Sequence, residues 1–203
     1  MHVALIGISG HVGTRLADEL IARGHTVTGI ARSITHLPAR KGVTYASADA
    51  TQSETLIPLF KDKDAVISAT RFVSSNPQEL LNAVRRSGVP RLLMVGGAGS
   101  LELAPGKRLL ESPGFPEAYR PEATAGLHVL NILRATADVD WTFLSPSAIF
   151  APGERTGIFR LDGDQLLTDA TGKSHISMED FAIAMVDELE HPLHRRRRFT
   201  VGY

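Results

Sequence analysis

Three glycines at a regular spacing, Gly7, Gly10 and Gly13, follow the first apolar run of the chain. Glycines placed in this way allow a tight turn out of a strand, close approach of the backbone to phosphate oxygens, and close packing of a helix on a sheet. The spacing Gly-x-x-Gly-x-x-Gly departs from the Gly-x-Gly-x-x-Gly of classical dehydrogenases, so the dinucleotide fingerprint is met approximately. We predict that this turn binds a dinucleotide pyrophosphate. The His11 ring either covers the pyrophosphate or points to solvent. The intervening residues of the predicted site are Ser9, His11 and Val12.

Arg32 follows an expected strand over residues 26–31, where a dinucleotide-binding fold places the adenosine ribose. An acid at this place selects the free hydroxyl of NAD, whereas a guanidinium pairs with a 2′-phosphate and stacks on adenine. Arg32 therefore favours NADP(H) over NAD(H), the alternative being a solvated surface arginine. Asp49 and Ala50 follow the next expected strand, and Asp49 either accepts a hydrogen bond from the adenine amine or simply begins a loop.

The composition limits the partners of the chain. Its 203 residues suit one α/β domain, and its 22 basic and 22 acidic residues give a net charge of zero. We therefore expect a small-molecule acceptor, and neither nucleic acid nor a membrane surface, as the partner. The absence of cysteine excludes disulfides and thiolate metal sites, and no metal ligands are predicted. The glycine-interrupted start without a basic leader predicts a cytoplasmic protein, either monomer or homodimer, with no signal peptide or membrane span.

Short apolar runs alternate with helical patterns along the chain, which is typical of a parallel sheet. Gly24 has the position of a helix stop, and Asn76 and Ser177 have positions of helix N-caps. The pattern predicts one Rossmann-type domain over residues 1–203, a doubly wound parallel α/β sheet with helices on both faces. The expected strands are 3–6, 26–31, 43–46, 65–68, 91–95, 141–144 and 199–201, and the expected helices are 12–22, 77–87, 121–137 and 177–190.

Two later segments lack this alternation. Residues 146–175 are rich in glycine, proline and polar residues, which predicts a substrate-facing loop or lid. Within it, Arg155 and Arg160 either attract an anionic acceptor, such as a flavin phosphate, or form ordinary salt bridges. Residues 194–198 form the one strong basic run, and nearby acids favour a salt-bridged strand entry over a nucleic-acid patch.

Several motifs together resemble the atypical short-chain dehydrogenase/reductases. The resemblance is strongest to the bacterial NAD(P)H-binding or NADH-flavin reductase group, which is similar to biliverdin reductase B and NmrA-like proteins. The resemblance covers nearly the whole chain. The segments at residues 95–101 and 152–157 are more specific to this group than the glycine fingerprint. The segments are residues 7–13 (GISGHVG), 95–101 (VGGAGSL), 145–146 (SP), 152–157 (PGERTG) and 176–182 (ISMEDFA).

The resemblance implies further cofactor contacts at the carboxyl ends of the strands. The stretch after the fourth strand would pass the adenosine side, where Thr70 or Arg71 would touch phosphate or ribose, with a surface role as the alternative for Arg71. The nicotinamide would face the segment from Gly96 to Ser100 and the loop after Ser145. The contacts implied in this way are Ala69, Thr70, Arg71, Gly96, Gly97 and Pro146.

The catalytic candidates depart from the pattern of carbonyl reductases. Those enzymes pair a tyrosine with a lysine four residues later, because the lysine lowers the phenol pKa and orients the ribose. Here Tyr119 is followed by Ala123, which favours a rim or packing role for Tyr119. Ser100 would hydrogen-bond the acceptor or the carboxamide, or cap its loop, and His128 is the best-placed histidine for a proton role, although helix histidines are commonly packed or solvated.

These observations favour an oxidoreductase that transfers a hydride from NADPH to a flavin-like or quinone-like acceptor, with any flavin a substrate rather than a bound prosthetic group. Such rings accept the hydride themselves, so binding and orientation suffice. The alternative is a non-catalytic, NmrA-like sensor of NADP(H), which the missing lysine supports. A sugar-nucleotide epimerase is the weakest hypothesis, because the catalytic pair is missing and the C-terminal part is short.

Overall fold

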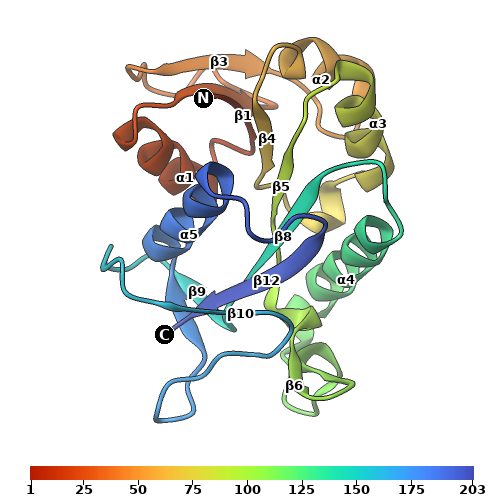
Figure 1. Ribbon diagram of the computed structural model, residues 1–203, viewed down its shortest axis with the longest axis vertical. Helices are drawn as coiled ribbons and strands as arrows, with labels where there is room; N and C mark the ends of the chain where they lie inside the picture. Colours follow the sequence, from red (N-terminus) through yellow and green to blue (C-terminus); the bar gives the residue numbers. More distant parts are fainter.

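The computed structural model describes residues 1–203 and contains an eight-stranded sheet of order β10-β12-β8-β5-β4-β1-β2-β3 (Figure 1). Every neighbouring pair is parallel except β10 with β12. The buried central strands are mostly apolar, as expected of parallel strands that are covered on both faces. The strands are β1 (His2–Ile6), β2 (Thr26–Ala31), β3 (Val43–Ser47), β4 (Ala65–Ser68), β5 (Leu92–Val95), β8 (Trp141–Pro146), β10 (Arg160–Asp162) and β12 (Arg197–Gly202).

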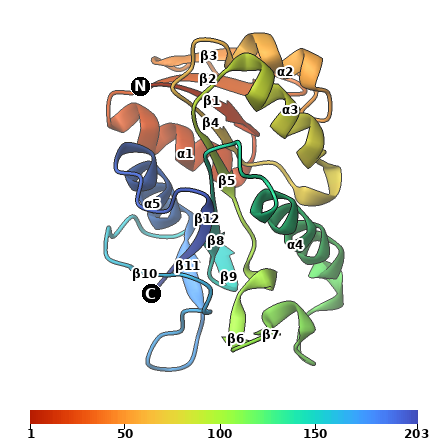
Figure 2. The ribbon, with the colours of Figure 1, turned by 45° about the vertical axis from the view of Figure 1, so that its right-hand side comes forward.

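Helices cover both faces of this sheet, as predicted (Figure 2). Helices α1 (His11–Ala22) and α5 (Met178–Glu190) pack together on one face, where Leu16 and Phe181 are fully buried. The other face carries α2 (Ser53–Phe60), α3 (Pro77–Ser87) and α4 (Arg120–Arg134) over a second apolar core. The predicted Rossmann-type α/β fold of one domain is therefore confirmed.

The ends of the helices follow local sequence signals. Asn76 Oδ1 accepts hydrogen bonds from the backbone at the start of α3, and Ser177 Oγ accepts one from Asp180 N at the start of α5. Gly24 ends the first βα unit with a φ of +80°. Helix α4 ends at Arg134, three residues before the predicted end, and α2 was not predicted at all.

Small elements lie beyond the carboxyl ends of the main strands. Strands β6 (Glu102–Ala104) and β7 (Lys107–Arg108) form a hairpin, seen at the foot of Figure 2. Strands β9 (Ile149–Ala151) and β11 (His175–Ser177) form a separate parallel pair. The sequence did not predict the positions of these strands, because each is too short to carry a periodic pattern. No helix of the structure combines the length and the apolar content needed to cross a bilayer.

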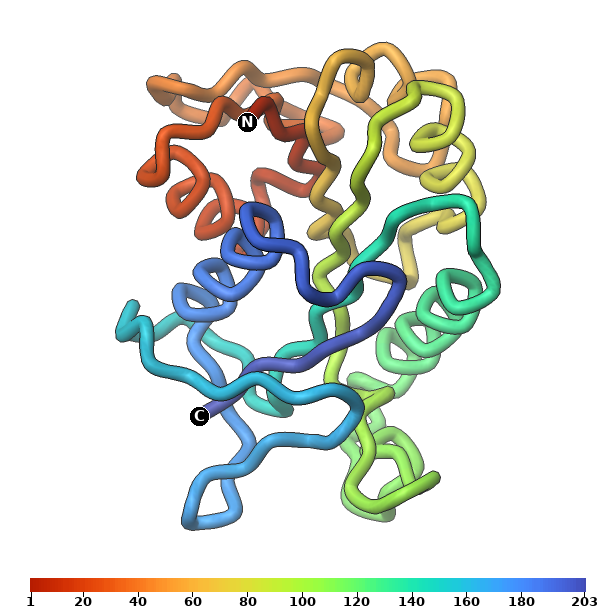
Figure 3. Tube along the Cα trace, viewed as in Figure 1, coloured from red at the N-terminus to blue at the C-terminus, as the bar shows by residue number.

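The segment 146–175 is mostly fastened to the body of the protein. It runs from the α5 side across to the β6 side (Figure 3), where Leu166 N donates to Glu102 O at 2.8 Å. Arg155 forms a bidentate pair with the buried Glu19 of α1, and Arg160 donates to the backbone oxygens of Thr168 and Tyr203. Both arginines are thus held by partners within the protein, as the alternative of a structural role expects, and only residues 146–150 of this segment line the large apolar cleft described below.

The basic run also serves the fold. Arg195 pairs with Asp140, Arg198 is buried and pairs with Asp164, and the His194 ring lies 2.8 Å from Glu188. Burial lowers the pKa of Arg198, which the nearby carboxylate opposes. The interpretation of this run as a salt-bridged strand entry is confirmed.

Asp180, at the start of α5, fastens the segment 146–175 to the sheet. Its carboxylate accepts hydrogen bonds from Thr156 Oγ1 at 2.5 Å, Gly157 N at 2.8 Å and the Tyr203 hydroxyl at 2.7 Å. Burial acts to raise the pKa of Asp180, but these hydrogen bonds prevail and hold it below its usual value.

A carboxyl group whose pKa is lower in the folded state stabilises the protein above its unfolded pKa, and this stability is lost as the pH falls through the folded pKa. We therefore expect the free energy of unfolding to fall below about pH 4. Asp180→Asn should cost about 1–3 kcal/mol at neutral pH and flatten this acid dependence. Urea unfolding across pH measures both effects, with the exposed Asp162→Asn as the control; equal acid slopes in Asp180→Asn and wild type would contradict the assignment.

Candidate functional site

The glycine turn between β1 and α1 is shaped by contacts within the protein at two of its three glycines. Gly7 has a φ of +83°, and a Cβ there would lie 2.6 Å from Ala69 O. A Cβ at Gly13 would lie 2.1 Å from Gly7 O. The fold itself therefore requires glycine at both positions.

Gly10 differs, because the nearest atom to a Cβ there would be Gly7 O at 3.3 Å. Gly10 is the N-cap of α1, which has no side-chain cap and no acidic residue in its first turn. Helices α3 and α5, by contrast, are capped by side chains. The first N–H groups of α1 and the positive end of its dipole thus remain available to an anion beside Gly10.

The glycine turn opens into a cleft of about 370 Å³, here called the glycine-turn cleft. It joins the carboxyl ends of β1, β2 and β4 to the loop after β3, which is where a dinucleotide binds in a doubly wound sheet. Most of the predicted cofactor contacts meet here, whereas His11, Val12 and Gly13 begin α1 behind the turn. The predicted residues that line it are Gly7, Ser9, Gly10, Arg32, Asp49, Ala50, Ala69, Thr70 and Arg71.

The far end of the glycine-turn cleft carries Arg32 and Asp49. Hydrogen bonds from Thr51 N and Thr51 Oγ1, at 2.9 and 2.8 Å, lower the pKa of Asp49, and the charge of Arg32 lowers it further. Asp49 is therefore ionised and a hydrogen-bond acceptor at neutral pH. Arg32 is exposed and forms no ion pair within 4.0 Å, so its guanidinium is available to a ligand.

A second cleft of about 500 Å³, here called the aromatic cleft, adjoins the first, since Arg71 lines one and Phe72 the other. Gly96, Gly97 and Pro146 line it, as the family resemblance implied. Its walls come from the loop 96–99, the segment 109–123 and the loop 146–150. The ring-bearing residues that line it are Phe72, Phe115, Pro116, Tyr119, Pro146 and Phe150.

Glu122 holds the junction of the two clefts, a role that the sequence did not reveal. Its carboxylate accepts hydrogen bonds from Phe72 N at 2.7 Å and Val73 N at 3.2 Å, and it lies 3.8 Å from Arg71. The Phe72 ring is stacked on Phe143 with 5.9 Å between ring centroids. The junction is therefore fixed from α4 and from the sheet together.

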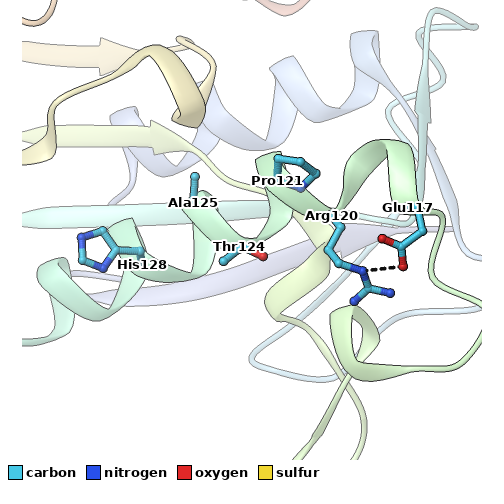
Figure 4. A pocket seen from close by; sticks show the side chains of 6 residues that line it. All are labelled: Glu117, Arg120, Pro121, Thr124, Ala125 and His128. Carbon is cyan, nitrogen blue, oxygen red and sulfur yellow. Dashed lines mark hydrogen bonds and ion pairs between the residues drawn. The ribbon is translucent and has the colours of Figure 1, made fainter.

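The structure brings one of the three predicted catalytic residues to the aromatic cleft. Tyr119 lines it and is 67% exposed, in agreement with a place at the rim. Ser100 is 6% exposed, does not line the cleft, and faces the Arg198 guanidinium. His128 lies on the outer surface of α4, in an open hollow that also holds the Arg120–Glu117 pair (Figure 4). The structure thus places Ser100 and His128 outside the aromatic cleft.

Ala123 stands where carbonyl reductases have lysine, and its surroundings are tight. A Cβ on Gly99 would lie 2.7 Å from Ala123 Cβ, so the loop 98–100 and α4 approach each other through two small residues. This close contact sets the position of the wall that Gly97 and Gly99 contribute to the aromatic cleft. The structure therefore explains the small residue at 123 by packing.

We expect Gly99→Ala to lower the free energy of unfolding by about 1–3 kcal/mol, because the added methyl group overpacks this contact. Gly114→Ala is the matched control: Gly114 lines the same cleft, its Cβ would meet nothing within 4 Å, and its φ is not positive. We expect that control to change stability by less than about 0.5 kcal/mol. Denaturant titration compares the two, and equal effects would contradict the packing argument.

Comparison with known proteins agrees with this geometry. Residues 7–192 match the sequence model of the family described as NAD(P)H-binding. The chain belongs to this family. The match confirms the resemblance drawn from the motifs, and it covers both clefts except for the first residue of the glycine-turn cleft, Ile6.

Individual relatives match along their whole length. The chain is 38% identical to the "uncharacterized protein YwnB" of Bacillus subtilis, covering 99% of this chain and 98% of that protein. A "putative epimerase" from Bacteroides thetaiotaomicron has 41% identity and a TM-score of 0.94 over 100% and 96% of the two chains. A "putative NADH-flavin reductase" from Streptococcus pneumoniae has 34% identity and a TM-score of 0.85 over 100% and 99%.

Proposed function

We propose that this protein is an NADPH-dependent oxidoreductase that transfers a hydride to a planar acceptor of the flavin or quinone type. The observation that carries this proposal is the meeting of the two clefts at Arg71 and Phe72. One cleft has the polar, glycine-lined form that suits a dinucleotide. The other is walled by rings and apolar side chains, which suits a flat acceptor beside it.

The residues of the glycine-turn cleft fit the cofactor. The uncapped first turn of α1 and the open approach at Gly10 would hold the pyrophosphate. Asp49 would accept a hydrogen bond from the adenine amine, and Arg32 would pair with the 2′-phosphate. When bound, the nicotinamide supplies the hydride. Gly96, Gly97 and Pro146 would bound its ring at the aromatic cleft.

The acceptor class follows from what the aromatic cleft offers. Tyr119 has no lysine partner, and Ala123 fills that position through close packing with Gly99. Carbonyl reduction or sugar epimerisation through a tyrosine–lysine pair is therefore disfavoured, although one relative is named as an epimerase. A flavin or quinone ring needs orientation beside the cofactor and takes its proton from water. The relative named as an NADH-flavin reductase supports this class.

The experiment is steady-state oxidation of NADPH, and of NADH alongside, with riboflavin and with simple quinones. We expect protein-dependent loss of the reduced-nicotinamide absorbance with at least one acceptor, and faster loss with NADPH than with NADH. Cofactor binding measured by calorimetry without turnover of any acceptor would contradict the enzyme.

The second candidate is a binding protein that senses the redox state of NADP(H). Ala123 packs closely against Gly99 at the position where carbonyl reductases have a lysine, so Tyr119 has no lysine partner for proton transfer. This absence of a tyrosine–lysine pair favours the second candidate. A sensor would discriminate strongly between NADP⁺ and NADPH in binding and would oxidise neither riboflavin nor quinones.

A further inference from the structure

We infer that the acceptor of the aromatic cleft is an uncharged ring system, such as a dephosphorylated flavin or a quinone, and that phosphorylated flavins are discriminated against. This inference rests on the proposed function and specifies its substrate. It starts from the charges around the aromatic cleft.

Eighteen residues line the aromatic cleft, and the one charged residue among them is Glu122. No lysine, arginine or histidine lines it. The carboxylate of Glu122 is fixed by Phe72 N and Val73 N at the side next to the glycine-turn cleft. Arg71 Nε lies 3.8 Å from this carboxylate, but Arg71 lines the glycine-turn cleft. An anionic acceptor would thus meet one fixed carboxylate, and no cation among the residues that line the aromatic cleft would attract it.

Arg120, at the start of α4 beside this cleft, is committed to other partners. Arg120 Nε donates to Glu117 at 2.8 Å, and its Nη1 donates to Leu110 O at 2.9 Å (Figure 4 shows the pair with Glu117). Its guanidinium also lies 5.6 Å from the centre of the Phe115 ring. Arg120 therefore braces the wall of the cleft from outside and does not enter the lining.

Arg155 and Arg160, the two arginines of the segment 146–175, do not supply the missing charge. Arg155 is held at α1 by Glu19, and Arg160 is held by backbone oxygens beside β12. Lys173 forms no ion pair and lines an adjacent hollow that shares Ile149 with the aromatic cleft. Lys173 thus stands outside the ring-binding walls.

The hydrogen-bonding groups of the cleft also suit a neutral ring. Ser112 Oγ donates to Leu109 O at 2.7 Å, and Ser147 Oγ donates to Val201 O at 3.0 Å. The hydroxyl of Tyr119 forms no hydrogen bond within the protein, and the residue is exposed. The cleft therefore offers one free hydroxyl donor among apolar walls, which matches a ring carbonyl oxygen of a flavin or quinone.

The test compares riboflavin with FMN, which carry the same ring and differ in the phosphate. With NADPH as donor under anaerobic conditions, we expect kcat/KM for riboflavin to exceed that for FMN by about tenfold or more. Quenching of flavin fluorescence by the NADP⁺-loaded protein gives the same comparison of affinities without turnover. Equal or better use of FMN, by either measurement, would overturn the inference.

Two variants at the half-exposed Ile149 sharpen this test. Ile149→Lys places a cation at the rim of the cleft. It should raise the ratio of kcat/KM for FMN to kcat/KM for riboflavin by about tenfold at low salt, and this gain should be lost at high salt. Ile149→Gln, the matched uncharged control, should leave the ratio as in wild type. A ratio that moves equally in both variants would overturn the electrostatic argument.

The outcomes separate the two proposals. If no acceptor oxidises NADPH but the fluorescence comparison still favours riboflavin, the proposed enzyme fails and the preference for an uncharged ring stands. If NADPH oxidation occurs with FMN preferred, the enzyme stands and the inference fails. Lys173→Gln would then show whether that lysine binds the phosphate.

Discussion

Replacing Arg32 with alanine is expected to weaken NADPH binding by about 10–100-fold and to change NADH binding by less than about threefold. Arg32 directly follows β2 at the wall of the glycine-turn cleft and has no carboxylate partner within 4.0 Å, so its removal leaves no unpaired group behind. The loss should come almost wholly from the 2′-phosphate, which NADH lacks. Isothermal titration with both cofactors measures the difference directly.

Arg32→Lys is the matched control, because it keeps the charge and loses the bidentate geometry. We expect the NADPH affinity of this variant to lie between those of the wild type and Arg32→Ala. Arg32→Asp should lower NADPH affinity further than alanine, since it adds repulsion. Equal losses for NADPH and NADH in Arg32→Ala would remove Arg32 from the 2′-phosphate site.

Replacing Gly10 with aspartate should weaken the binding of NADPH and NADH alike by about 100-fold or more. The new carboxylate would cap α1 and lie where the pyrophosphate is expected, so it would compete with the phosphates for the same N–H groups. The cap should offset the tight approach of the new Cβ to Gly7 O, at 3.3 Å. Stability should therefore change by no more than about 1 kcal/mol.

Calorimetric titration and urea unfolding together separate binding from folding in this variant. Gly163→Asp is the control, because Gly163 is exposed and a Cβ there meets nothing within 4 Å. Gly13→Ala should show the opposite behaviour and unfold the protein, since its Cβ would lie 2.1 Å from Gly7 O. Normal cofactor affinity in Gly10→Asp would contradict a pyrophosphate site at the first turn of α1.

Most of the sheet and the long helices could be predicted because their signals are local. Apolar runs identify β4 and β5, and Asn76 and Ser177 mark helix starts by side-chain chemistry alone. Helix α2 was missed: it has eight residues with Pro58 inside, and its stability comes from packing against α3. The β6–β7 hairpin was missed because its strands are too short to carry a periodic pattern. The β9–β11 pair depends on contacts between distant segments, which no local pattern encodes.

The two clefts also differ in how far local sequence signals predict them. The glycine-turn cleft follows from a contiguous motif and from strand ends that a parallel sheet must bring together. The aromatic cleft draws Phe115 and Phe150 from segments far apart in the chain, and Glu122 is marked by nothing in the sequence around it. The sequence could not show that Ser100 and His128 lie outside the aromatic cleft, because the type of a residue and its position along a helix do not state which side it faces.

The most direct test of the central claim is a single anaerobic turnover of the NADPH-loaded protein with riboflavin. Bleaching of the reduced-nicotinamide band and of the flavin band would be recorded together. We predict that the two bands disappear at the same rate and in equal amounts, much faster than in the absence of protein. Loss of both bands at the rate of the protein-free solution, with cofactor demonstrably bound, would contradict hydride transfer as the function of this fold.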